Sequence, residues 1–193
     1  MSSTAIYTGT FDPFHTGHAQ TLREAYRAHP FDRLVVGLHY NNPDKPEATD
    51  FSHRANIVKI GVRAAGLPFE AEVQPLYHGP FENFLQKHAP GDKLIRIVGS
   101  DTIVTTIKDG HLSRLPLCHY LITVRPQLTN REELESVING LPDRIKASFS
   151  FEILPTPAST AEARKIRPNI QAGYAKGLLT PDVIKYIEEH SLY

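Results

Sequence analysis

The sequence predicts an α/β fold, a doubly wound Rossmann-like parallel sheet with helices on both faces. Short runs rich in β-branched residues alternate with amphipathic segments from one end of the chain to the other. The β-rich runs are apolar throughout, as strands are when helices cover both faces of a parallel sheet. Strand–helix alternation of this kind is typical of a doubly wound sheet.

Turn residues bound each of the expected strands. We expect clear strands at residues 4–8, 33–40, 94–99 and 118–124, and weaker ones at 69–76 and 149–154. Helices are expected between them, because apolar residues recur there at helical spacing. The expected helices cover residues 18–29, 52–66, 129–140 and 180–193. The last begins with Thr180 as a cap and Pro181 at its first position, which is where proline fits a helix.

The chain has the size and composition of one globular domain. It has 193 residues, 22% of them charged, and a formal net charge of zero, so we expect one domain over 1–193 with a small C-terminal helical part from about residue 157. Neutral charge argues against nucleic-acid or membrane-surface binding, which need positive charge. We see no leader peptide and no apolar run long enough to span a bilayer, and expect a cytoplasmic protein.

The first loop carries the strongest functional signal. After the first strand the chain reads GTFDPFHTGH, residues 9–18, and a helix follows. Ligands of parallel sheets bind beyond the carboxyl ends of the strands. Gly9 permits close backbone approach, and the N-terminus of the next helix favours an anion. His15 and His18 can converge there on one phosphate group.

Two other interpretations of the histidine pair are weaker. A zinc site needs three or four ligands, and no Cys, His and Asp cluster lies close in sequence. Cys118 is the only cysteine, which excludes an intrachain disulfide and a thiolate cluster. Isolated histidines at this spacing are usually surface or core residues. We therefore predict a phosphate-handling pair and no metal-ligating residue.

Residues 9–18 resemble the first motif of the nucleotidylyltransferase (HIGH) superfamily, GTFDPxHxGH, at every fixed position. The resemblance implies that His15 and His18 are catalytic and that the loop binds nucleotide through Gly9, Thr10, Phe11 and Gly17. It continues to the last residue and is greatest to the nicotinate and nicotinamide mononucleotide adenylyltransferases.

Three later segments carry this narrower resemblance. NNPDKP resembles a phosphate-binding loop with Lys45 as its lysine, and Arg54 matches a position on the following helix. IVGSDT resembles the GxD motif, which implies nucleotide binding by Gly99 and ribose binding by Asp101. The alternatives are that Lys45 and Arg54 are ordinary solvated charges and that Asp101 only caps a helix. The RP pair of the family appears as Arg125-Pro126.

The chain departs from the family pattern in two places. The tryptophan that helps to hold the pyridine ring is missing, and His111 is the candidate to replace it, or only a loop histidine. The C-terminal ISSTxxR motif is altered. Ser159 and Thr160 match its nucleotide-binding hydroxyl residues, and Arg164 is the first candidate for its catalytic arginine, with Arg167 in reserve.

The resemblance implies an adenylyltransferase of NAD biosynthesis. It would move AMP from ATP to nicotinate mononucleotide, a phosphorylated small-molecule acceptor, and release pyrophosphate. Mg²⁺ would accompany ATP, and Lys45, Arg54 and His111 are the candidate acceptor contacts. The alternatives are a sister transferase for nicotinamide mononucleotide or another phosphorylated metabolite, and a non-catalytic nucleotide-binding regulator. Assembly into a homo-oligomer stays open.

Overall fold

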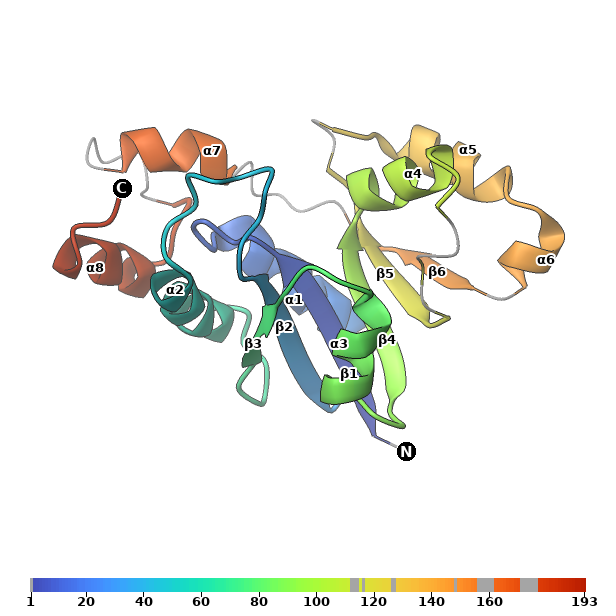
Figure 1. The fold of residues 1–193 in the computed structure, drawn as a ribbon, viewed down its shortest axis with the longest axis horizontal. Helices are drawn as coiled ribbons and strands as arrows, with labels where there is room; N and C mark the ends of the chain where they lie inside the picture. The colour runs from blue at the N-terminus through green and yellow to red at the C-terminus, as the bar shows by residue number, and fades with distance from the viewer. Residues whose placement is uncertain are drawn as a thin grey trace.

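A single six-stranded parallel sheet organises the molecule, with strand order β3-β2-β1-β4-β5-β6 (Figure 1). The computed structural model describes residues 2–111, 115, 117–125, 128–147, 149–155, 162–170 and 177–193, without the side chain of Arg164. The strands are β1 Ser3–Gly9, β2 Arg33–His39, β3 Glu72–Leu76, β4 Lys93–Gly99, β5 His119–Thr123 and β6 Ser150–Ile153. All six expected strands are present, and the predicted fold class is confirmed.

The four expected helices are also present. They are α1 Thr16–Ala28, α2 Phe51–Arg63, α5 Arg131–Asn139 and α8 Pro181–Glu189. Thr180 caps α8 by accepting a hydrogen bond from the Val183 amide. Further helical segments that the sequence analysis did not delimit are α3 Phe81–His88, α4 Ser100–Lys108, α6 Asp143–Lys146, α7 Ala163–Ile166 and the 3₁₀ turn η2 Arg167–Asn169.

The register of the strands assigns their side chains to two layers. Tyr7 lies beside Val36 and Ile97, and these side chains join the large core cluster that includes buried residues of α1, α2 and α8. The residues next to them in the sequence point to the opposite face of the sheet. Ile6 and Val35 pack with buried residues of α3, while the outer strands contribute to a separate cluster with α4 and α5. Figure 1 shows α3 in front of the strands and α1 behind them.

The C-terminal segment shares the core of the sheet. Ile166, Leu179, Val183 and Ile187 are buried in the same cluster as α1 and α2. The Thr16 amide at the start of α1 donates to the Leu178 carbonyl, 2.9 Å away. Residues 156–161, where we expected the C-terminal part to begin, lie outside the described residues. The C-terminal segment is therefore tied to the helix that carries His18.

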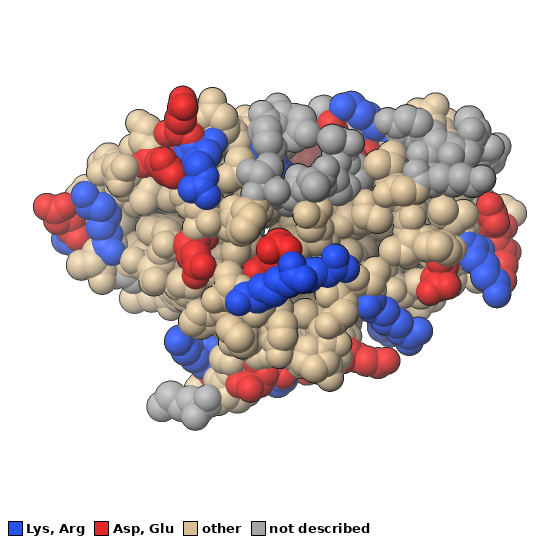
Figure 2. Space-filling model, turned by 180° about the vertical axis from the view of Figure 1, so that it is seen from behind, with Lys and Arg blue, Asp and Glu red and all other residues tan. Residues whose placement is uncertain are grey.

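The surface charge is mixed. On the face turned away from the view of Figure 1, acidic and basic side chains lie interspersed among the coloured residues (Figure 2). This pattern agrees with the zero net charge. None of the helices in the described part of the chain is long and apolar enough to pass through a membrane.

Candidate active site

The candidate site lies where the order of the strands reverses. β1 and β4 are neighbours, while the chain continues outward from β1 to β2 on one side and from β4 to β5 on the other. The connections therefore diverge above the carboxyl ends of β1 and β4, at Gly9 and Gly99. Open parallel sheets bind their ligands in this crevice.

His15 and His18 form a stacked pair at the N-terminus of α1. His15 is the residue before the helix and His18 is in its first turn, with buried Gly17 between them. Their ring centroids are 3.6 Å apart with 20° between the planes. The backbone N–H of His15 donates to Nδ1 of His18 at 3.1 Å. Because that Nδ1 accepts, a neutral His18 carries its proton on Nε2, where it can be donated to a ligand.

Both imidazoles are held neutral in the free protein. Burial lowers the pKa of His15 to about 3, and the nearby Arg125 charge adds to the effect. Burial also lowers the pKa of His18 well below its usual value, with contributions from His15, Arg125 and Lys45. The buried Nδ1 of His15 has no hydrogen-bond partner among the described residues. An unpaired buried nitrogen next to cationic side chains suits an anionic ligand.

Aromatic side chains surround the pair. The Phe11 ring meets His18 edge-on at 5.0 Å between centroids, and Phe14 lies 5.1 Å from it. Phe11 has a φ of 47°, a left-handed conformation that is rare outside glycine. A Cβ atom at Gly9 would lie 2.8 Å from the Phe11 ring. Phe11 therefore packs against His18, and the absence of a side chain at Gly9 leaves space for the Phe11 ring.

Arg125 is the functional residue that the sequence analysis did not assign to the site. It follows β5, and its backbone N–H donates to Ser100 Oγ at 3.1 Å. Its guanidinium lies 3.6 Å from Asp101 Oδ1, and a Cβ atom at Gly99 would lie 2.4 Å from the same oxygen. The match of Arg125-Pro126 to the RP pair of the family could have identified this residue. Its position beside the histidines follows only from the arrangement of the strands.

Arg54 supports the loops that surround the site. It is 2% exposed, and its guanidinium donates to the backbone carbonyls of Thr49, Thr10, His39 and Tyr40. These bonds use four of the five N–H groups of an arginine. The hydroxyl of Thr10 accepts from the Asn42 side chain at 2.9 Å. Four of its five N–H donors thus bind the backbone, and contact between Arg54 and the acceptor stays a prediction.

Lys45 and His111 lie in different surroundings. Lys45 is exposed in the loop after β2, and its charge contributes to the lowered pKa values of His18 and His39. His111 is also exposed, but it follows the far end of α4. Asp101 lies in the first turn, and the seven residues from there to Lys108 put that end of the helix about 10 Å away. The structure brings Lys45 to the histidines and leaves His111 at a distance.

The loop that carries the histidines is anchored to the C-terminus. Asp12 is 4% exposed and accepts a hydrogen bond from the Tyr193 hydroxyl. It also pairs with Arg167 at 2.8 Å, and Arg167 reaches Glu47 at 3.3 Å. These contacts engage Arg167 with two carboxylates, and the choice between Arg164 on α7 and Arg167 for the phosphate stays a prediction. Ser159, Thr160 and the Arg164 side chain lie outside the described residues.

Comparison with known proteins identifies the family of this chain. The family model described as cytidylyltransferase-like matches residues 6–160. A probable nicotinate-nucleotide adenylyltransferase of Chlorobaculum tepidum is 29% identical, with 98% of each chain covered. A protein of the same description from Solibacter usitatus is 30% identical at the same coverage.

A solved structure has the same fold. It is the nicotinic acid mononucleotide adenylyltransferase of Plasmodium falciparum complexed with NaAD, which matches with a TM-score of 0.74 and 18% identity. The alignment covers 100% of this chain and 98% of that one. The matched residues include both histidines and the strands that position them, so this chain belongs to the cytidylyltransferase-like family.

Proposed function

We propose that this protein is an adenylyltransferase that moves AMP from ATP to nicotinate mononucleotide. The stacked pair of neutral histidines at the switch point of the sheet, with one buried nitrogen that no described residue pairs, carries the assignment to phosphate chemistry. The acceptor follows the relatives, which carry the nicotinate-nucleotide description over nearly their whole length. The products are a dinucleotide and pyrophosphate.

The reaction needs no general base or covalent intermediate. A phosphate oxygen of the acceptor is already ionised at neutral pH, and it attacks the α-phosphorus of ATP in line. The new P–O bond forms as the bond to the β-phosphate oxygen breaks, and the electron pair leaves with pyrophosphate. Catalysis therefore depends on positioning and on stabilising negative charge in the transition state.

Each nearby side chain has a part in stabilising this charge. The Nε2–H of His18 donates to a phosphate oxygen, and His15 beside it contributes a second imidazole. Neutral donors add no charge repulsion between two rings that stack so closely. Lys45, Arg125 and Arg164 supply positive charge, and Asp101 binds the ribose from the first turn of α4. Gly9, Thr10 and Gly17 form the loop under the phosphates.

ATP-dependent transfer in this family implies a divalent metal ion, which we propose to be Mg²⁺. The described carboxylates around the site are engaged, since Asp12 pairs with Arg167 and Asp101 lies near Arg125. Glu162, whose charge acts on His15, pairs with Lys165. The residues therefore fit a metal held mainly by phosphate oxygens and water, as is usual for Mg²⁺. Such an ion neutralises charge on the triphosphate.

An exposed aromatic pair is a candidate platform for the pyridine ring in place of the missing tryptophan. Tyr40 follows β2 and Tyr77 follows β3, and their ring centroids are 5.1 Å apart. Tyr77 is 61% exposed and Tyr40 42%, so both rings are accessible to a ligand. Both lie at the edge of the sheet that holds the histidines, unlike His111.

The proposed function is tested by turnover of two acceptors at saturating Mg-ATP, followed as pyrophosphate release. We expect a higher kcat/KM for nicotinate mononucleotide than for nicotinamide mononucleotide. A carboxylate needs only donors, whereas an amide must also find an acceptor. An equal or higher kcat/KM for nicotinamide mononucleotide would contradict nicotinate mononucleotide as the preferred acceptor, but not adenylyl transfer itself. Failure of both, with turnover of another phosphorylated metabolite, would favour a sister transferase. Nucleotide binding without any turnover would favour a regulator.

A further inference from the structure

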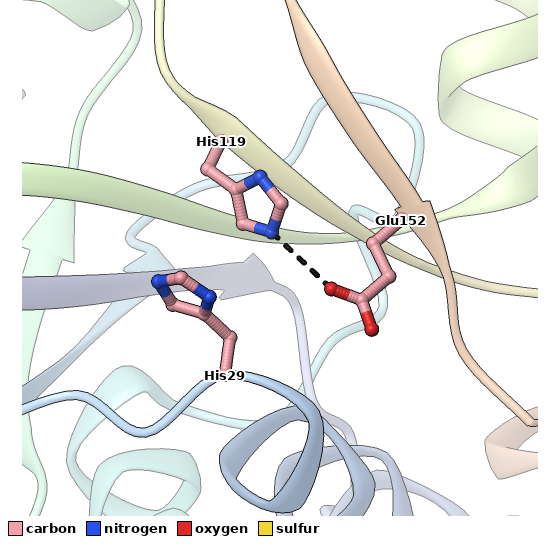
Figure 3. Close-up of side chains that lie close together, drawn as sticks. All are labelled: His29, His119 and Glu152. Carbon is pink, nitrogen blue, oxygen red and sulfur yellow. Dashed lines mark ion pairs between the residues drawn. The ribbon is translucent and has the colours of Figure 1, made fainter.

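Three potential metal ligands meet at the other end of the sheet, far from the catalytic histidines. His29 follows the C-terminus of α1, His119 is the first residue of β5, and Glu152 is on the edge strand β6. One ligand atom from each lies within 4.8 Å of the others (Figure 3). No sequence motif predicts the cluster, because its three residues come from elements far apart in the chain.

The fold directs these three side chains to the same place. His119 lies beside Ser150 in the register of β5 and β6, and Leu121 lies beside Glu152. Residues two apart on a strand share a face, so His119 and Glu152 point to the side of the sheet that packs on α1. The end of α1 then brings His29 over them, with 4.7 Å between the two imidazole centroids.

The spacing within the cluster suits two ligands of one metal ion. His119 Nε2 and Glu152 Oε2 are 3.5 Å apart, the ion pair dashed in Figure 3, and this buried nitrogen contacts no other polar partner among the described residues. Two ligands on a tetrahedral zinc ion, with bonds of about 2.0–2.1 Å, are separated by about 3.4 Å. The other ring nitrogen of His119 lies 2.8 Å from Ser150 Oγ. Such a contact on Nδ1 orients metal-binding histidines and leaves Nε2 for the metal.

We infer that His29, His119 and Glu152 form a binding site for a divalent transition-metal ion of the zinc class. Two imidazoles and one carboxylate are a common zinc ligand set, in which water completes the coordination. A hollow of about 770 Å³, lined in part by His29 and His119, gives the ion access from solvent. The ligand atoms lie within 4.8 Å of one another, and His29 follows a helix end, so rotation of these side chains would bring them onto one ion.

Nearby charged and thiol groups define the limits of the site. Asp92 lines the hollow, but it already accepts from Thr4 and Arg33. Lys93 also lines it and opposes a cation, so the carboxylate of Glu152 is essential to the charge balance. Cys118 directly precedes β5; it lines the same hollow and also packs against the hydrophobic cluster on the opposite face of the sheet. The metal would therefore join α1 to the two outer strands, with no part in adenylyl transfer.

The test is a zinc titration of the full-length protein after dialysis against a chelator. We expect one Zn²⁺ per chain by calorimetry and elemental analysis, and a Tm that rises with zinc concentration. Co²⁺ in the same protein should show the visible absorption of a tetrahedral ion. His29→Ala and Glu152→Gln should each weaken zinc binding at least about tenfold, the scale of changes to the shell of a metal site. His78→Ala, which removes an exposed histidine elsewhere, should bind as the wild type does.

Three results would overturn the inference. Zinc binding that is absent or far from one per chain would reject the site. Equal binding by the wild type, His29→Ala and Glu152→Gln would show that the ion binds elsewhere. Loss of zinc in His18→Ala would place it on the catalytic pair. Glu152 is 43% exposed, so its replacement by glutamine tests the ligand without disturbing the core.

Discussion

Two histidine pairs at opposite ends of one sheet have neighbours of opposite charge. His15 and His18 are stacked in a buried, aromatic setting where Arg125 and Lys45 supply positive charge. His29 and His119 are less buried and face the carboxylate of Glu152. Imidazole can donate or accept, so the neighbouring groups decide what it binds.

The comparison also separates two ways of bringing histidines together. The catalytic pair is three residues apart and is positioned by the first turn of one helix. The second pair depends on where α1 ends and on how β5 and β6 are aligned. A change in one helix turn should therefore disturb the first pair alone.

The largest expected effect is on turnover in His18→Ala. We expect a fall of about two orders of magnitude or more, the range for losing one preorganised donor at a charged transition state. Circular dichroism should show a folded protein, and zinc should still bind at one per chain. The matched variant His190→Ala, at the end of α8, should keep normal turnover. Normal turnover in a folded His18→Ala variant would contradict the proposal that His18 stabilises the transition state.

The second effect is a loss of stability at acidic pH that depends on His15. Its pKa is about 3 when folded and near 6.5 when unfolded, so the unfolded chain binds more protons between these values. The stabilisation is present above about pH 6.5 and is lost as the pH falls. From pH 7 to pH 5 the loss is about 2 kcal/mol for this group.

Urea unfolding at pH 7 and pH 5 measures this difference. In His15→Asn the fall in free energy of unfolding should be smaller by about 2 kcal/mol, because the titrating group is gone. His78→Ala, which alters an exposed histidine, should keep the wild-type fall. An unchanged fall in His15→Asn would mean that this imidazole is not held neutral by burial.

A smaller effect is expected at Arg125. Arg125→Ala should lower kcat/KM for ATP about tenfold, because it removes a charge beside the histidines and leaves Asp101 without its neighbour. Steady-state rates over a range of Mg-ATP concentrations would measure it. Arg131→Ala, which alters an exposed pair within α5, is the matched control and should change little. An equal result for both variants would exclude Arg125 from the site.

The smallest effect is expected where the C-terminus meets the catalytic loop. Tyr193→Phe removes the hydroxyl that donates to buried Asp12, whose contacts with Arg167 and the Thr49 amide remain. We expect a loss of about 1 kcal/mol in the free energy of unfolding. Tyr77→Phe, at an exposed ring, should leave stability unchanged. Equal stability of the two variants would mean that this anchor contributes nothing measurable.

The sequence by itself predicted the six strands, the four main helices and the family, because these depend on local patterns. Apolar runs specify buried strands, and Asn130 and Thr180 show where helices begin. The histidine pair was equally visible, since three-residue spacing at a helix start places two side chains together whatever the rest of the chain does.

Only the tertiary structure decided which side chains meet across the chain. It buried Arg54 on four backbone carbonyls, brought Arg125 to the histidines and joined His29, His119 and Glu152. It also made His15 neutral, because burial under neighbouring groups sets that pKa. Spacing along the chain determines neighbours within a turn, whereas contacts between elements depend on strand order, register and packing, which no short pattern contains.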